Sequence, residues 1–181
     1  LYNNNVTGNG YVGIAFNGSN SSIFGNNIMN NGFNGIDLEG SSLYPPLHNR
    51  IFGNNLTGNG RSGIIVQARN NTIWGNNIAH NEIGIDFLAS TYNTIFGNNI
   101  AYNKGAGISF YSSSYNSIYR NNFIQNTVSL CCPSPVNTWD GGYPSGGNYW
   151  TAYSGVDERR GPKQDQPGSD GISDTPYIFD S

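Results

Sequence analysis

Apolar side chains recur along this chain with a period of about 22 residues. The first apolar position of each repeat is held by Leu1, Ile23, Ile51, Ile73, Ile95 and Ile118. The steps between these positions are 22, 28, 22, 22 and 23 residues, and the long step contains an insertion around GSSLYPPLHN. A steady period of this length predicts a solenoid, in which each repeat packs on its neighbours.

Each repeat contains three short apolar stretches separated by Asn, Gly and Ser. The third has the form Gly-Ile-x-apolar, as in GIDL at 35–38, and its period of two predicts a strand. Three short strands per repeat, stacked about 4.8 Å apart, predict an all-β fold, a parallel β-helix of about six turns. We expect residues 1–130 to form these turns and residues 131–181 to form a loop-rich cap, since open solenoid ends need covering.

Asparagine recurs at fixed points of the repeat, as in NTIFGNNI at 93–100. Stacked Asn amides can donate to one turn and accept from the other, and Asn tolerates the left-handed backbone of a tight corner. The pattern therefore predicts Asn ladders that stabilise the fold and do not mark a binding site. The expected columns are Asn26, Asn54, Asn76, Asn98, Asn121; then Asn27, Asn55, Asn77, Asn99, Asn122; and Asn9, Asn31, Asn59, Asn81, Asn103, Asn126.

The residue after the first apolar position is aromatic in all six repeats. These residues are Tyr2, Phe24, Phe52, Trp74, Phe96 and Tyr119. If strand alternation turns them outward, they form a stripe suited to sugar rings or to another subunit. If the corner turns them inward, they form a stack in the core. The sequence leaves both arrangements open.

Two carboxylates are the candidates for catalysis. Asp37 and Asp86 share the outward position of the third strand, two turns apart and so about 10 Å from each other, with Ile65 between them. Arg61 or Lys104 could assist a polysaccharide lyase or glycoside hydrolase. The alternative is that both carboxylates are solvated surface groups.

Composition and charge exclude some functions. Only 10% of the 181 residues are charged and the net charge is −3, which is not the basic face that nucleic-acid binding requires. No apolar run approaches the about 18–20 residues that cross a bilayer. The acids concentrate in the final segment, where Asp157, Asp165, Asp170 and Asp174 lie among glycines. Closely spaced carboxylates on a loop predict a structural Ca²⁺ site, although the spacing is not that of an EF-hand, and the alternative is a plain acidic loop without metal.

Other features bear on the protein's setting. Cys131 and Cys132 are adjacent, so a bridge between them would be strained, and two thiols are the simpler expectation. The alternatives are a strained bridge between the two and a cross-link to another chain. Glycosylation sequons occur at Asn5, Asn17, Asn20, Asn55 and Asn70, which fits a secreted protein. Because Leu1 begins inside a repeat, we expect the first turn to continue into upstream turns or to contact another copy head to tail, as in a filament.

The repeats and tail together resemble the NosD-like β-helix proteins, also described as carbohydrate-binding and sugar-hydrolase β-helix domains. The residues that carry the resemblance are the N-x-I-x-G-N-x-I repeats, GGNYW at 146–150, AYSGVD at 152–157 and GSDGISDTPY at 168–177. The resemblance implies a right-handed β-helix, an exported location and a C-terminal module. Its named member serves the maturation of a copper enzyme, whereas this chain has only two His and one Met besides its two Cys.

These observations favour an extracellular or cell-surface module with a structural or adhesive role and no catalytic activity. A polysaccharide lyase or hydrolase using Asp37 and Asp86 is the first alternative. A carbohydrate-binding module using the aromatic column is the second.

Overall fold

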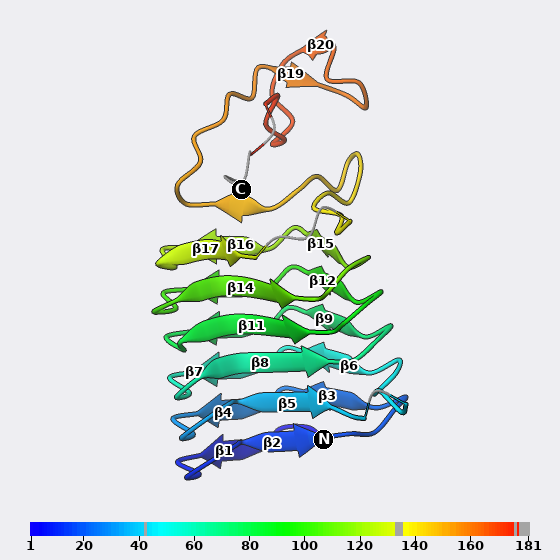
Figure 1. Ribbon diagram of the computed structural model, residues 1–181. Helices are drawn as coiled ribbons and strands as arrows, with labels where there is room; N and C mark the ends of the chain where they lie inside the picture. Colours follow the sequence, from blue (N-terminus) through cyan, green and yellow to red (C-terminus); the bar gives the residue numbers. More distant parts are fainter. Residues whose placement is uncertain (42, 133–135, 176, 178–181) are drawn as a thin grey trace.

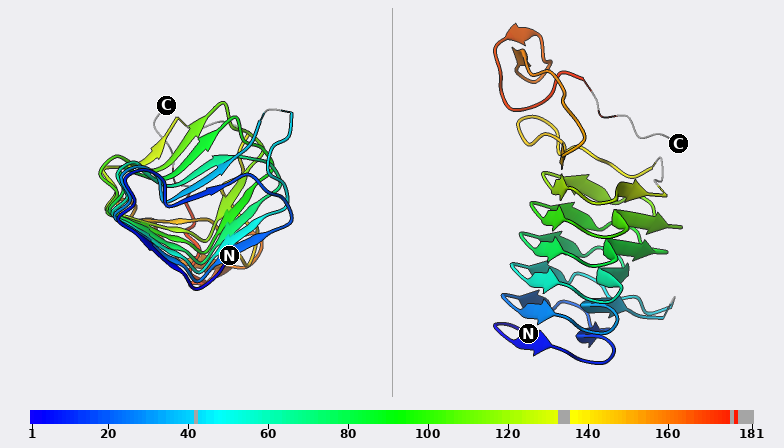
Figure 2. Two further views of the ribbon diagram at one scale, coloured as in Figure 1. Left: turned by 90° about the horizontal axis from the view of Figure 1, so that it is seen from below. Right: turned by 90° about the vertical axis from the view of Figure 1, so that its left-hand side faces the viewer.

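The structure is a computed structural model that describes residues 1–41, 43–132, 136–175 and 177. It confirms the predicted parallel β-helix: turns of chain stack along one axis, with three parallel sheets around an apolar interior (Figure 1). The described residues include no helix, and so none that is long and apolar enough to cross a membrane. Seen along the axis, successive turns superimpose closely (Figure 2).

Sheet A has five strands that start each repeat after the first. Its strands are β3 (Ser22–Phe24), β6 (Arg50–Phe52), β9 (Thr72–Trp74), β12 (Thr94–Phe96) and β15 (Ser117–Tyr119). The central isoleucine of each strand pairs with that of the next, and all five are at most 1% exposed. The period seen in the sequence therefore corresponds to a column of isoleucine side chains stacked in the interior.

Sheet B follows sheet A around each turn and has seven strands. They are β1 (Asn5–Thr7), β4 (Asn27–Met29), β7 (Asn55–Thr57), β10 (Asn77–Ala79), β13 (Asn99–Ala101), β16 (Asn122–Ile124) and β18 (Tyr149–Trp150). Each of the first six places a central apolar residue inward and an Asn beside it on the outer surface.

Sheet C completes the turn with six strands of three to six residues. They are β2 (Ile14–Phe16), β5 (Ile36–Glu39), β8 (Ser62–Gln67), β11 (Ile83–Leu88), β14 (Ala106–Tyr111) and β17 (Val128–Cys131). A separate antiparallel pair, β19 (Arg159–Arg160) and β20 (Gln166–Pro167), lies in the C-terminal segment.

The predicted Asn ladders are confirmed. In the first column, Nδ2 of Asn54 donates to Oδ1 of Asn76 at 3.0 Å and to the Ile23 carbonyl oxygen at 3.0 Å. The third column is built in the same way. In the second column the amides point the other way, since Nδ2 of Asn77 donates back to Oδ1 of Asn55. Buried amides thus satisfy backbone carbonyls at the corners, and surface amides satisfy one another.

A fourth Asn column was missed by the sequence analysis. It consists of Asn49, Asn71, Asn93, Asn116 and Asn137. The first four lie two positions before sheet A isoleucines, Asn137 lies two positions before Trp139, and all five are at most 7% exposed. Their steps of 22, 22, 23 and 21 residues were visible in the sequence. The column could have been found by aligning every position of the repeat.

Each corner uses a left-handed residue. After sheet A the corner is Gly25, Gly53, Gly75 and Gly97, with φ between 60° and 64°, but in the sixth turn it is Arg120 at φ 55°. The corner before sheet A is Asn20, His48, Asn70, Tyr92 and Tyr115. Left-handed backbone is costly for residues other than Gly and Asn, so the corners at His48, Tyr92, Tyr115 and Arg120 carry backbone strain that the Gly and Asn corners avoid.

The solenoid extends further than residue 130, where the sequence analysis placed its end. Thr138 pairs with Ser117 of sheet A, and β18 pairs with β16 of sheet B. Asn137 and Asn148 continue two Asn ladders. A seventh, partial turn therefore exists. It is hard to see in the sequence because the segment between Asp140 and Asn148 interrupts the period with glycines.

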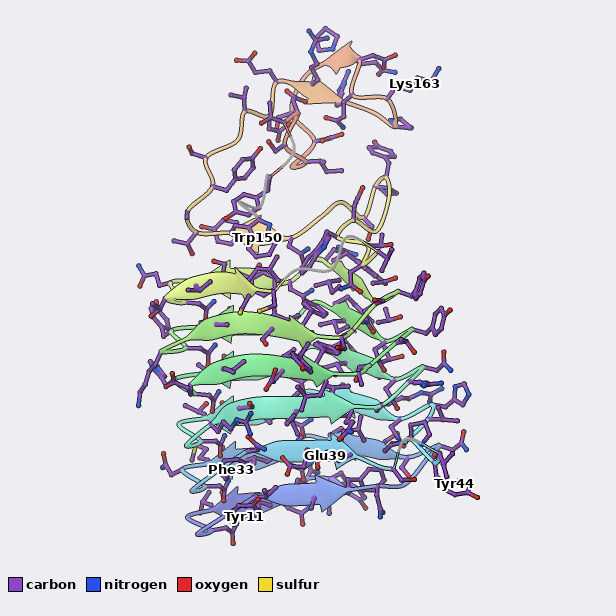
Figure 3. All side chains as sticks on the ribbon, in the orientation of Figure 1. Tyr11, Phe33, Glu39, Tyr44, Trp150 and Lys163 are labelled. Carbon is purple, nitrogen blue, oxygen red and sulfur yellow. The ribbon has the colours of Figure 1, made fainter. Side chains whose placement is uncertain are left out.

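Aromatic residues close the C-terminal end of the apolar interior. Trp150, labelled in Figure 3, is 4% exposed. It stacks on Phe123 with ring centroids 4.2 Å apart and on Tyr177 at 4.9 Å. Trp139 packs edge-on against Phe110 at 5.6 Å. The remaining chain, with β19 and β20, lies beyond this layer (Figure 2).

Candidate functional site

The outer face of sheet C carries Asp37, Glu39, Arg61 and Asp86, four of the nine charged side chains of residues 1–130. The register places Asp37, Ile65, Asp86 and Ser109 in one outward row across β5, β8, β11 and β14. Glu39 lies two residues after Asp37 on the same strand and is visible near the middle of this face (Figure 3). The sequence prediction that Asp37 and Asp86 share one outward row with Ile65 between them is therefore confirmed.

Asp86 is buried on this face, so the alternative of two solvated carboxylates is wrong for it. Its side chain is 6% exposed, and its Oδ2 lies 3.8 Å from an Arg61 guanidinium nitrogen. Ser109 Oγ donates to Oδ1 of Asp86 at 3.0 Å. The Arg61 guanidinium also lies over the Phe33 ring, 5.2 Å from its centroid. A buried carboxylate is costly unless it is paired, so Arg61 is held by Asp86.

Asp37 and Glu39 lack such a partner. Burial raises the pKa of Asp37, and the Asn34 amide and the Arg61 charge only partly offset this effect. Burial also raises the pKa of Glu39, and the negative charge of Asp37 raises it further. In the described part of the chain, Arg61–Asp86 is the one ion pair within 4.0 Å. Both carboxyl groups therefore lie where negative charge is poorly stabilised.

Three polar atoms near this row have no hydrogen-bond partner. They are Nδ2 of Asn34, Oδ1 of Asp37 and Oγ of Ser62. Asn34 and Ser62 are 1% and 0% exposed, and their turns are joined by a bond from the Ser62 N–H to Oδ1 of Asn34 at 3.0 Å. Asn34 is close enough to lower the Asp37 pKa, but no hydrogen bond of regular geometry joins the two. Buried unsatisfied atoms are uncommon in native proteins and call for a physical explanation.

Of the two basic residues expected to assist, only Arg61 lies with the aspartates. Lys104 is exposed in the turn before β14, where its backbone N–H donates to the Asn81 carbonyl oxygen at 2.9 Å. No ion pair joins Lys104 to either aspartate in the described residues. Ser109, Asn34 and Ser62 were not singled out from the sequence, because neither their burial nor their neighbours across turns follows from residue type.

The aromatic column lies outside, along sheet A, which settles the arrangement that the sequence left open. Its rings stack on one another with planes 2–8° apart and centroids 4.4–5.9 Å apart. Only Tyr2, at the first turn, is mostly exposed, at 62%. Each interior ring therefore has a neighbouring ring against both faces. Sugar rings stack on exposed aromatic faces, so this column forms a stabilising ladder with little ring face left for a sugar.

The acidic residues of the C-terminal segment are used in several separate hydrogen-bonded turns. Asp157 accepts bonds from Ser169 Oγ and from the backbone N–H groups of Asp170 and Gly171. These bonds lower the Asp157 pKa, the Ser169 bond most. Asp174 accepts from the N–H groups of Glu158 and Arg159.

Asp170 similarly accepts from the Gly161 N–H and from Gln164 Nε2, whereas Asp165 is exposed. Within the described ranges, no three His, Cys, Asp or Glu side chains come together as a metal site. Calcium binding by this segment stays a prediction.

A cleft of about 970 Å³ separates the last turn from the C-terminal segment. Aromatic side chains line it, among them Trp139, Tyr149 and Tyr153, and so do Asp157 and Asp174. Tyr153 Oη spans part of it, bonding to Ser173 Oγ at 2.9 Å and to the Thr175 hydroxyl at 2.7 Å. These contacts tie the segment to the solenoid end.

The remaining expected sites are spread over the surface. Four of the sequon residues are exposed, namely Asn5, Asn17, Asn20 and Asn70, but Asn55 is half-buried with its amide bonded to Asn27 Oδ1 at 2.8 Å. Cys131 and Cys132 are free thiols with Sγ atoms 2.9 Å apart. The bond from Cys132 raises the Cys131 pKa most, and burial adds to it, so this thiol resists ionisation.

Comparisons with known proteins agree with the fold. A family model described as periplasmic copper-binding protein (NosD) matches residues 1–155. This range ends just past the partial seventh turn that β18 completes. No curated protein matches.

Two solved structures are alginate or mannuronan epimerases. The periplasmic alginate epimerase AlgG aligns with a TM-score of 0.66 and 21% identity, over 76% of this chain and 37% of that one. The A-module of the Azotobacter vinelandii mannuronan C-5 epimerase AlgE6 aligns with a TM-score of 0.57 and 16% identity, over 76% of this chain and 55% of that one. This chain thus spans about a third to a half of these proteins, and the likeness concerns the fold.

The family description names copper, and the side chains of this chain offer few ligands for it. Copper sites use clustered His, Cys or Met ligands. Here His48 and His80 are exposed in turns on different sides of the solenoid, and Met29 lies on sheet B beside Asn55. The adjacent cysteines supply two sulfur atoms, and no third His, Cys, Asp or Glu joins them within the described chain. These residues do not fit a copper site of three or more ligands.

Proposed function

The chain belongs to the NosD family, and from that premise we propose that it is an exported polysaccharide-binding β-helix module. Its binding surface is the outer face of sheet C, around Asp37, Arg61 and Asp86. It holds a glycan without transforming it, as expected of a structural or adhesive module.

The observation that carries the proposal is the outward row on sheet C, where Asp37, Asp86 and the Arg61 guanidinium gather on one face of the solenoid. Together these side chains supply both donors and acceptors of hydrogen bonds. Hydroxyl groups both donate and accept, so a sugar suits a mixed set of this kind.

Two further facts support a long ligand. Sheet C repeats every turn, so equivalent outward positions recur about every 4.8 Å along the axis, close to the length of one sugar unit. The structures that align with this chain include two proteins named for action on alginate or mannuronan. A carbohydrate-related role is consistent with that fold, although the ligand of those proteins is not carried over.

The test is retention on immobilised polysaccharides, by affinity electrophoresis of the purified protein. We expect Arg61→Ala and Asp37→Asn each to weaken retention by about tenfold, because each removes a polar contact worth about 1–1.5 kcal/mol. Trp74→Ala, on the aromatic column, should leave retention unchanged if the domain stays folded by circular dichroism. Retention that follows Trp74 and ignores Arg61 would move the binding surface to sheet A.

The second candidate function is a polysaccharide lyase or hydrolase on the same face. The raised Asp37 pKa favours it, because a carboxyl group that keeps its proton can act as a general acid. The double variant Asp37→Asn/Asp86→Asn should then lose all product formation on uronate-rich and neutral polysaccharides. Absence of products from the unaltered protein as well would leave the binding function alone.

A further inference from the structure

The two cysteines lie together because the backbone turns between them. Cys131 ends β17 and pairs in register with Ser109, which places it in the outward row of sheet C. In β14 the residue after Ser109 is Phe110, which alternation directs inward and which is 2% exposed. Cys132 follows Cys131 in the same way, but it adopts φ 56° and is exposed. Its left-handed backbone breaks the alternation, and the two Sγ atoms therefore lie 2.9 Å apart.

Packing of the interior does not impose this turn. Trp139 packs edge-on against Phe110, with ring centroids 5.6 Å apart, and so covers the end of the column that Cys132 would otherwise extend. A left-handed backbone is costly for cysteine, as for most residues with a side chain. Among the described strands, β17 lies at the edge of sheet C and pairs only with β14, so the chain can leave the sheet here. Backbone strain that the fold does not require is typical of functional sites.

The two sulfur atoms are placed to form a bond. A disulfide holds its sulfur atoms about 2.05 Å apart, so closing Cys131 on Cys132 requires an approach of less than about 1 Å. The chain has only these two cysteines, so within one molecule neither has another partner. Its family is described as periplasmic, and disulfides form and persist in such oxidising compartments. We propose that Cys131 and Cys132 are a reversible redox site, which alternates between a dithiol and a vicinal disulfide.

The two thiols differ in exposure, which sets the order of the exchange. Cys132 is the exposed one, so its thiolate attacks a disulfide such as oxidised glutathione, forms a mixed disulfide and releases one glutathione thiolate. The hydrogen bond with Cys132, and then burial, raise the pKa of Cys131, so this thiol ionises less readily and reacts second. Its Sγ attacks the Cys132 Sγ, and the second glutathione leaves with the bonding electrons. The two cysteine protons pass to the released thiolates, so one disulfide is consumed and one is formed.

The vicinal disulfide is labile. Neighbouring Cα atoms are about 3.8 Å apart, below the range of about 4.4–6.8 Å for ordinary disulfides, so the bond is strained and readily reduced. It closes the shortest possible loop and therefore constrains the unfolded chain little. These properties suit reversible exchange with other thiols and disulfides better than a structural role. The redox site needs no bound glycan and so stands apart from the proposed function.

Equilibration of the purified, unaltered protein in glutathione buffers of rising oxidised fraction tests the proposal. Free thiols are trapped with N-ethylmaleimide and counted by intact mass. We expect both maleimide labels to be lost together, with a protein mass lower by two hydrogen atoms and with neither a glutathione adduct nor a cross-linked dimer. Dithiothreitol should then restore both labels in the folded protein, without denaturant.

The variant Cys131→Ser isolates the second step of the exchange. It should retain glutathione on Cys132, because no second thiol is present to displace it. Two labels on the unaltered protein in every buffer would overturn the proposal. A lasting glutathione adduct on the unaltered protein, a dimer linked through these cysteines, or an oxidised pair that resists dithiothreitol would each overturn it too. These outcomes are read from the unaltered protein, so they hold even if the variant fails to fold.

Discussion

Oδ1 of Asn98 accepts two hydrogen bonds from Asn76 in the preceding turn, from its side-chain Nδ2 at 2.9 Å and from its backbone N–H at 3.0 Å. Asn76 Nδ2 also donates to the carbonyl oxygens of Ile51 and Trp74. One side chain thus satisfies backbone groups in two turns and links to a third. This arrangement repeats down the column, so each amide depends on those beside it.

The ladder predicts very different costs for adjacent asparagines. Asn76→Ala should lower the free energy of unfolding by about 3 kcal/mol or more. The change leaves buried hydrogen-bond donors and acceptors without partners, and each such group costs about 1–3 kcal/mol. Asn77→Ala is the matched control, since the Asn77 side chain is exposed and bonds to the surface amides of Asn55 and Asn99. Its loss should cost about 0.5 kcal/mol. Urea unfolding of both variants measures the difference, and equal costs would contradict the role of the buried ladder.

Asp37→Asn is expected to stabilise the protein at neutral pH. The folded-state pKa of Asp37 lies above its usual value of 3.8, so the folded form favours the protonated carboxyl. Its contribution is fully present below the unfolded pKa and is lost as pH rises through the folded pKa. The variant should therefore have a higher Tm than the unaltered protein at pH 7 and the same Tm near pH 3. A lower Tm for the variant at pH 7 would show that the charged Asp37 side chain stabilises the folded protein.

Asp157 should have the opposite pH dependence. Its pKa is lowered by bonds from Ser169 and from the N–H groups of Asp170 and Gly171. Stability from this group is present above its unfolded pKa and is lost as pH falls through the lower folded pKa. Hydrogen exchange at Asp170 and Gly171 should therefore accelerate in Asp157→Ala at neutral pH, relative to the intrinsic rate. Asp165→Asn is the control and should leave both amides protected.

The corner at Arg120 offers a stabilising substitution. Four preceding turns place Gly at this left-handed position, whereas Arg120 adopts φ 55°. Arg120→Gly should raise the free energy of unfolding by about 1 kcal/mol, which corresponds to a Tm rise of about 2–4 °C for a chain of this size. The reverse change at a preceding corner, Gly75→Arg, should lower it. Thermal unfolding followed by circular dichroism measures both changes. A fall in Tm for Arg120→Gly would contradict the inference that the left-handed backbone at Arg120 is strained.

The calcium prediction for the C-terminal segment has a direct test. If Asp157, Asp165, Asp170 and Asp174 hold Ca²⁺, adding a chelator should lower the Tm and raise proteolysis within residues 151–175, as loss of a ligand bound to the folded state does. The solenoid residues should keep their protection. Identical cleavage with calcium and with chelator would show that the hydrogen bonds of these carboxylates hold the segment in place without Ca²⁺.

Sequence by itself determined the solenoid and most of its interior. A parallel β-helix stacks equivalent residues, so the period directly gives the neighbours of Ile51 or Asn76 in space. The same logic placed Asp37 and Asp86 in one outward row. It would also have yielded the Asn49 column, had every repeat position been aligned. It failed only where the period is interrupted, as between Asp140 and Asn148.

Tertiary structure decided what the outward residues do. Period and alternation show that Asp86 points outward, but its burial depends on Arg61, Phe33 and Ser109, which come from other turns. The orientation of Phe24 and Trp74 at a corner likewise depends on local backbone angles that alternation does not specify. Stacking of their rings then covers the faces that a sugar would need. Burial and pairing are properties of several turns together, so residue type and spacing alone could not reveal them.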